Sequence, residues 1–269
     1  MTAPRTATSK TPSTAAPTTR AMSTWRLEWL RLIRTPRWIA LFGVYVIFGL
    51  LGPVMAKYLP EIVEHVQSEM TIVVPPPQPK DGIINYINQV GQTGLIVVVA
   101  IAASALAFDA HRGLSTFLRT RATGMWVLVR PRVVVTAVAA VLAYALGTLA
   151  AWYETGLLLG PLPVGAVLAG VLCGALYLVF AVAVVTAAAA LARKTVGIVG
   201  IALSALILMS IAGTLGVLHD WLPSTLVGAP VELLTNTTLM DYLPAMAVTV
   251  AAAVALVVLA VVVLRRREV

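Results

Sequence analysis

Cysteine and histidine are scarce in this sequence. Its 269 residues include a single cysteine, Cys173, so a disulfide framework and a cysteine-based metal site are both excluded. The three histidines, His65, His111 and His219, lie far apart along the chain, and no H-E-x-x-H pattern occurs. We therefore expect no metal site on this chain.

Phosphate-binding glycines and carboxylates inside apolar stretches are also missing. The stretch "AAAALARKT" ends in Lys194 and Thr195 but lacks the glycines that let backbone amides approach a phosphate. Glu154 and Asp109 lie only at the ends of apolar stretches, whereas proton- or sodium-coupled transporters usually need carboxylates or broken helices near the membrane midplane. We expect no enzymatic activity and no cofactor on this chain.

Charged residues make up only 11% of the sequence and hydrophobic residues make up 59%. Soluble domains average about 25% charged residues, so this composition indicates a membrane protein. A helix needs about 20 apolar residues to cross a bilayer core of roughly 30 Å. The sequence predicts an all-α polytopic membrane protein with six transmembrane helices. The predicted spans cover residues 38–57, 89–109, 133–154, 163–191, 196–218 and 243–264.

The basic residues lie almost entirely on one side of the predicted spans. Of 19 lysines and arginines, only Lys57 and Lys80 fall on the other side. Of 11 acidic residues, only Glu28, Asp109 and Glu268 share the basic side. The positive-inside rule then places both termini in the cytoplasm. It also explains the net charge of +8 without a nucleic-acid partner.

The N-terminal region divides into two parts. Residues 1–22 are rich in Thr, Ala, Pro and Ser, so we expect a disordered cytoplasmic tail ahead of a transmembrane domain over residues 23–269. The following stretch, "STWRLEWLRLIRTPRW", predicts an amphipathic helix on the membrane surface, the alternative being an ordinary juxtamembrane segment. Its apolar side comprises Trp25, Trp29, Leu32 and Ile33.

Two further stretches carry recognisable patterns. "FDAHRGLSTFLRTRATGMWVLVRPR", residues 108–132, predicts a short surface helix with an apolar side and basic flanks, which suits docking either to lipid headgroups or to a cleft in a cytosolic protein. Residues 219–242 are moderately apolar and contain two prolines, which suits a helical hairpin dipping into the outer leaflet. "GVLCG" carries a GxxxG, Gly170 and Gly174, which we expect to pack against a neighbouring helix of the same chain.

Over roughly residues 23–267 the chain resembles the permease subunits of ABC-2 type ABC exporters, which move drugs, lipids and glycoconjugates out of bacteria. "STWRLEWLRLIRTPRW" resembles the elbow helix of that family. The loop after the second span resembles its coupling-helix loop, with Asp109 where the family usually has Glu, then Gly113, an apolar run, and a basic residue at Arg130 or Arg132. "LPSTLVGAPVELLTNTTL" resembles its re-entrant element before the last span.

The resemblance implies a transporter of two permeases and two ATPases in the bacterial cytoplasmic membrane. The second permease is an identical or homologous chain, and ATP and Mg are held by the separate ATPase subunits. The loop after the second span would seat as a coupling helix in an ATPase groove. The residues implied in coupling are Asp109, Arg112, Gly113, Leu114, Phe117, Leu118, Arg119 and Arg121.

We expect the transported compound to be hydrophobic or amphipathic, such as a drug, lipid or peptide. The residues that we expect along its path are Tyr45, Phe48, Met55, Ser204, Met209, Ser210 and Thr214. Three alternatives remain open at this point. One is a membrane scaffold or sensor that docks a cytosolic partner without transport, and the others are a secondary transporter and a membrane-embedded enzyme.

Overall fold

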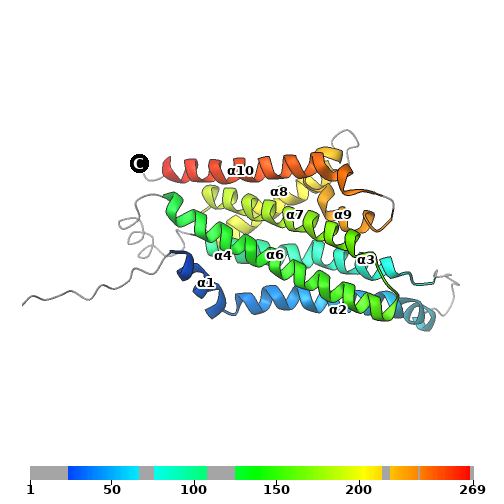
Figure 1. Cartoon of the computed structure of the whole chain (residues 1–269). Helices are drawn as coiled ribbons and strands as arrows, with labels where there is room; N and C mark the ends of the chain where they lie inside the picture. The colour runs from blue at the N-terminus through cyan, green and yellow to red at the C-terminus, as the bar shows by residue number, and fades with distance from the viewer. Residues whose placement is uncertain (1–23, 67–75, 108–124, 214–218, 236, 267–269) are drawn as a thin grey trace, which may run out of the picture.

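The computed structural model describes residues 24–66, 76–107, 125–213, 219–235 and 237–266, and within these residues every regular element is helical. Figure 1 shows the helices as one elongated bundle. The α-helices are α1 (Thr24–Arg34), α2 (Arg37–Val66), α3 (Pro79–Gln89), α4 (Leu95–Leu106), α6 (Met125–Leu158), α7 (Val164–Leu191), α8 (Thr195–Ala212), α9 (Thr225–Glu232) and α10 (Leu243–Arg266). A π-helix, η1 (Val90–Gly94), joins α3 to α4, and two short 3-10 helices, η2 (His219–Trp221) and η3 (Leu239–Tyr242), flank α9.

Six helical stretches of the described chain are long and apolar enough to cross a membrane. This confirms the prediction of an all-helical, multi-pass membrane protein with six such helices. The stretches are Arg37–Val63, Pro79–Leu106, Val129–Leu158, Val164–Leu191, Thr195–Ala212 and Leu239–Arg266.

The second of these stretches begins earlier than the sequence predicted. The helix starts at Pro79, where the Gln78 backbone N–H donates to the Asp81 carboxylate at 2.8 Å, and not at residue 89. The polar residues of "PKDGIINYINQ" lower its hydropathy, yet one side of this helix is apolar and buried. That side is formed by Ile83, Tyr86, Ile87 and Val90. The fifth helix ends at Ala212, and residues 214–218 of its predicted span lie outside the described residues.

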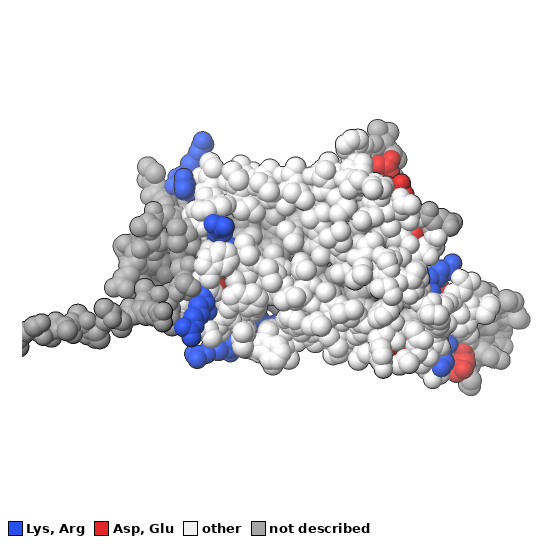
Figure 2. All heavy atoms as spheres, in the orientation of Figure 1, with Lys and Arg blue, Asp and Glu red and all other residues white. Residues whose placement is uncertain are grey.

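The six stretches run up and down the bundle, so α1 and the C-terminal end of α10 lie at the same end of it (Figure 1). Figure 2 shows charge gathered at the two ends of the visible face, with a broad uncharged band between them. We call the end with α1 the basic end and the opposite end the acidic end. The basic end carries Arg31, Arg34, Arg37, Arg130, Arg193, Lys194, Arg265 and Arg266. The acidic end carries Glu61, Asp81, Glu154, Asp220, Glu232 and Asp241, together with Lys57 and Lys80.

Small residues allow the helices to approach closely. The core is rich in alanine, and α7 packs against α4, α6, α8, α9 and α10. On α7, a methyl group added at Gly170 would lie 2.9 Å from the Cα of Pro230 on α9, and one added at Gly174 would collide with the Tyr144 ring on α6. The GxxxG pair therefore packs within the chain, as the sequence predicted. Close packing of this kind is the main source of helix association in lipid.

The backbones of α2 and α6 approach closely at Gly49, where an added Cβ atom would collide with the Gly147 carbonyl oxygen, and at Gly147 itself. A Cβ atom at Gly147 would lie 2.6 Å from the carbonyl oxygen of Tyr45 and 2.7 Å from the hydroxyl of Tyr86. A backbone carbonyl cannot move aside without moving its helix. Gly147 is thus required for α2 and α6 to touch.

We expect Gly147→Val to destabilise the bundle by roughly 1–3 kcal/mol or more, because overpacking here forces two helices apart. Gly156→Val is a matched control on the same helix, since a Cβ atom there meets nothing within 4 Å. Thermal unfolding and gel filtration of the two variants in detergent would measure the difference. Equal unfolding temperatures for both variants would contradict the proposed α2–α6 contact.

Candidate functional site

A groove opens between the second span, α8 and α9, with a volume of about 430 Å³. Its polar lining comes from four side chains on three different segments: Asn88 and Gln92 from α3 and η1, Ser210 from α8, and Glu232 from α9. The remaining lining residues are Ile84, Ile87, Gly91, Val227, Gly228 and Val231. The groove therefore combines an apolar base with a small number of hydrogen-bonding groups, which is typical of small-molecule sites.

Asn88 and Gln92 are unusual for their position in the helix. They lie near the middle of the Pro79–Leu106 stretch and four residues apart, and both side chains are exposed. Neither amide has a hydrogen-bond partner among the described residues. The hydrocarbon core of a membrane offers no hydrogen-bonding group. Polar side chains inside it therefore usually face another protein group or a water-filled cavity. The π-helix η1 begins between them, and π-helical segments are frequent at functional sites.

Glu232 is the one charged residue that lines the groove. Its carboxylate accepts a hydrogen bond from the Tyr242 hydroxyl of η3, which fixes the carboxylate at the end of α9. The helix itself is held from behind, because Leu226, Ala229 and Pro230 are buried and α9 packs against α3 and α7. The groove thus presents a fixed negative charge beside two amides.

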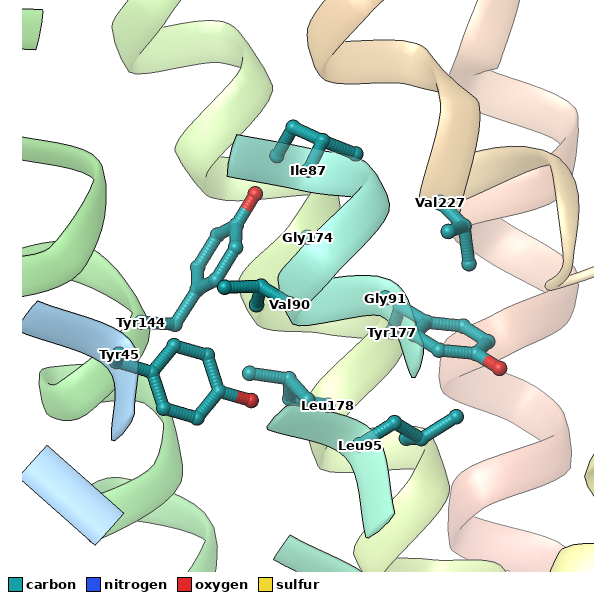
Figure 3. A pocket seen from close by; sticks show the side chains of 10 residues that line it. All are labelled: Tyr45, Ile87, Val90, Gly91, Leu95, Tyr144, Gly174, Tyr177, Leu178 and Val227. Atoms are coloured by element: carbon teal, nitrogen blue, oxygen red, sulfur yellow. The ribbon is translucent and has the colours of Figure 1, made fainter. Parts of the chain in front are cut away.

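A second, smaller cavity of about 30 Å³ lies inside the bundle among three tyrosines (Figure 3). Tyr45 comes from α2, Tyr144 from α6 and Tyr177 from α7. The Tyr45 and Tyr144 rings meet edge to face, with centroids 6.1 Å apart. Gly174 leaves room for the Tyr144 ring, and we call this space the tyrosine cavity.

The tyrosine hydroxyls differ in their partners. The Tyr86 hydroxyl, next to the cavity, donates to the Tyr144 carbonyl oxygen at 3.1 Å, and the Thr148 hydroxyl lies 2.9 Å from the same carbonyl. The Tyr45 hydroxyl is fully buried and has no partner among the described residues. Figure 3 shows this hydroxyl pointing into the cavity. A buried hydroxyl without a partner costs about 1–3 kcal/mol, which makes it a marker of function or of a bound molecule.

The groove and the tyrosine cavity share a wall. Ile87, Gly91 and Val227 line both. A Cβ atom at Gly91 would contact only the Val227 side chain, at 3.7 Å, so Gly91 adds no side chain to this wall and Val227 is the side chain that lies nearest to it. The two spaces are therefore neighbouring compartments on the two sides of η1 and α9.

The basic end holds a different arrangement, built around Arg132 of α6. Its guanidinium Nε donates to the Glu28 carboxylate of α1 at 2.8 Å, and its Nη1 donates to the Ala105 carbonyl oxygen of α4 at 3.2 Å. Arg132 is only 7% exposed. Since α4 ends at Leu106, Ala105 offers one of the carbonyls that a helix end leaves unpaired. One side chain therefore ties α1, α4 and α6 together.

A cation–π contact also joins α1 to α6, since the Arg130 guanidinium lies 5.9 Å from the Trp25 ring centroid. The four residues of the predicted apolar side of α1 are divided: Leu32 packs against the core and Trp29 is half-buried, whereas Trp25 and Ile33 are exposed. The helix over residues 24–34 is therefore present, docked on α6 through charged residues as well as apolar ones.

The predicted coupling residues and path residues do not form a single site among the described residues. The coupling residues Asp109, Arg112, Gly113, Leu114, Phe117, Leu118, Arg119 and Arg121, and Thr214 of the predicted path, lie outside the described residues. The structure does not bring the remaining path residues together. Tyr45 lines the tyrosine cavity, Ser210 lines the groove, Phe48 and Met209 pack against the core, and Met55 and Ser204 are exposed.

The roles of several residues in these sites were not predicted from the sequence. Asn88 and Glu232 fall outside the predicted spans, and Gln92 falls near the start of the predicted span 89–109. None of the three was predicted as a site residue, although the i, i+4 spacing of the two amides is visible in the sequence. Arg132 was named only as a loop cation and as one of two candidates for the basic residue of the coupling-helix motif, because its partner Glu28 is distant in sequence. Among the described residues, no group of three His, Cys, Asp or Glu side chains is placed to hold a metal ion.

No protein-family model, no curated protein and no solved structure matches the chain. The class that the described fold defines is a multi-pass helical membrane protein with six candidate spans.

Proposed function

We propose that this chain is the permease subunit of an ATP-driven ABC exporter, energised by a separate cytosolic ATPase. The observation that carries the proposal is the contact of Arg132 with both Glu28 and Ala105. These residues lie on the elements before and after residues 108–124, where the coupling helix is expected. A push on that segment would act directly on the end of α4, on the start of α6 and on α1.

The distribution of carboxylates supports an energy source outside the spans. Four carboxylates, Glu61, Asp81, Glu154 and Asp241, lie among the described residues of the six stretches. All four are close to the acidic end, and none lies at a helix midpoint. Ion-coupled transporters usually carry such groups near the bilayer centre. Hydrolysis of ATP on a partner chain supplies the same driving force without them.

In this proposal the basic end faces the cytoplasm and the acidic end faces outward, following the positive-inside rule. The eight residues of α9 extend about 12 Å, too short to cross the bilayer, so α9 enters the outer leaflet and returns. Its backbone is shielded there by α3 and α7. The groove then lies in the outer half of the membrane, on the side to which an exporter delivers its cargo.

The working transporter would contain two permease chains, identical or homologous, and two ATPases. Its cargo would be hydrophobic or amphipathic, such as a drug, lipid or peptide, because the groove and the cavity offer mainly apolar walls with few polar groups. The direction, outward, rests on the resemblance to exporters.

Purification of the tagged chain from its own membranes into lipid nanodiscs tests the proposal. We expect an ABC-type ATPase to accompany it in equal amount and to hydrolyse Mg-ATP. A scaffold would instead bring a partner without ATP hydrolysis, and a secondary transporter would bring none. Either of these results, from membranes in which the chain is intact, would overturn the proposed function.

A further inference from the structure

We propose that the groove and the tyrosine cavity form one binding site, and that its ligand is an amphipathic organic cation with a hydrogen-bonding group at its apolar end. The ammonium group would lie in the groove beside Glu232. The apolar body would cross the shared wall at Gly91. The far polar group would meet the hydroxyl of Tyr45.

The charge of the ligand follows from the groove. Glu232 is its one charged lining residue, and the other polar lining groups are the neutral side chains of Asn88, Gln92 and Ser210. A carboxylate attracts a cation, and the amide and hydroxyl oxygens accept hydrogen bonds from an ammonium group. An anionic head would face Glu232 with no cation in the lining to offset the repulsion.

The apolar body of the ligand follows from the shared wall. Ile87 and Val227 present aliphatic surface on both sides, and Gly91 has no side chain to close the gap between them. The tyrosine cavity has room at present for little more than one or two waters, so entry of a ligand requires the Val227 side chain to turn aside. Val227 is half-buried on the short helix α9, which is held in place by the close contact of Pro230 with Gly170. The movement required is therefore one of side chains.

The far end of the ligand follows from Tyr45. Its hydroxyl is fully buried, points into the cavity and has no described partner, whereas the Tyr86 hydroxyl beside it is satisfied. The cavity holds little more than one or two waters, so the part of the ligand that meets Tyr45 is no larger than a hydroxyl group. The ring that carries this hydroxyl would lie at the shared wall, against Ile87 and Val227. A site that hydrogen-bonds a ligand hydroxyl discriminates strongly against the analogue that lacks it, because the buried partner is then left unpaired.

The test uses the full chain in nanodiscs without any ATPase, and two matched pairs of probes. Tyramine and 4-(4-aminobutyl)phenol are each compared with the analogue that lacks the phenol hydroxyl. The two amines differ in the length of the chain that joins the ammonium group to the ring, so they test two separations between Glu232 and Tyr45. We expect saturable binding by calorimetry, with at least one hydroxylated amine bound tenfold or more tightly than its partner. Tyr45→Phe should reduce that preference to about twofold or less while leaving the thermal unfolding temperature nearly unchanged.

Three further variants test the site of the ammonium group at Glu232 and the shared wall at Gly91. Glu232→Gln should weaken both members of a probe pair at least tenfold, whereas Asp220→Asn, which removes an exposed charge at the same end, should not. Gly91→Leu should close the passage and abolish the hydroxyl preference. No saturable binding by the wild type, or a hydroxyl preference that survives Tyr45→Phe, would overturn the proposal. Unchanged binding in Glu232→Gln would do the same.

The binding site stands independently of the energy source, but the view of its ligand as cargo rests on the proposed function. If the amines bind while no ATPase accompanies the chain, the binding site stands and the exporter proposal fails. If an ATPase accompanies the chain while no amine binds, the reverse holds.

Discussion

Replacing Arg132 with alanine should destabilise the folded chain by about 3–5 kcal/mol, because it leaves the Glu28 carboxylate without its main partner at a largely buried position. The Glu28 side chain is only 17% exposed, and it lies 2.8 Å from the Arg132 guanidinium. The same change removes the hydrogen bond to the Ala105 carbonyl at the end of α4. Helix α1 should then detach from α6, which trypsin cleavage at the arginines within Thr24–Arg34 and thermal unfolding in nanodiscs would both detect.

Arg31→Ala is the matched control for this prediction. Arg31 also approaches Glu28, at 3.9 Å, but its side chain is 42% exposed. Exposed ion pairs contribute about 0–1 kcal/mol, so this variant should unfold almost as the wild type does. Glu28→Gln should reproduce part of the Arg132→Ala effect, and the two changes combined should cost less than their sum because they remove the same contact. Similar losses in the Arg31 and Arg132 variants would show that the three-helix contact adds nothing specific.

The number of spans could be predicted from the sequence because hydropathy is a local property of each segment. The start of the second span could not, because Asp81 and the asparagines of α3 mask a buried side that appears only when helical spacing is considered. Its apolar positions, Ile83, Tyr86 and Ile87, follow that spacing and are all buried. A test for amphipathic character applied to polar stretches beside each span would have found it.

The contacts that build the sites depend on pairs distant in sequence. Arg132 and Glu28 are separated by 104 positions, so no local pattern identifies them as partners. The tyrosines of the cavity come from α2, α6 and α7 and become neighbours only through helix packing. Tyr45 and Ser210 were selected as path residues on residue type alone, and the structure places them in two neighbouring compartments. Their shared wall at Gly91 had no signal in the sequence beyond an isolated glycine.

The central claim, that residues 109–121 couple this chain to an ATPase, predicts the second large effect. Replacing Leu114, Phe117 and Leu118 together with serine removes three apolar side chains from the proposed contact. Burial of one such side chain is worth roughly 1.5–3 kcal/mol, so the combined loss of several kcal/mol should disrupt a modest interface. Because all three lie outside the six spans, the variant should insert in the membrane and unfold as the wild type does.

Arg119→Ala is the comparison variant, since an exposed charge pair contributes only about 0–1 kcal/mol and is screened by salt. Its effect should be small and more evident at low ionic strength. The two variants share the same segment and differ only in whether apolar or charged contact is removed.

The most direct measurement is the rate of ATP hydrolysis by the complex purified with the tagged chain in lipid nanodiscs, compared between wild type and the triple serine variant. The account predicts that the triple variant is purified in normal amount but without the ATPase and without its activity, while Arg119→Ala retains both. If the triple variant instead keeps the full amount of ATPase and the full hydrolysis rate, residues 109–121 do not couple this chain to an ATPase, and the account is contradicted.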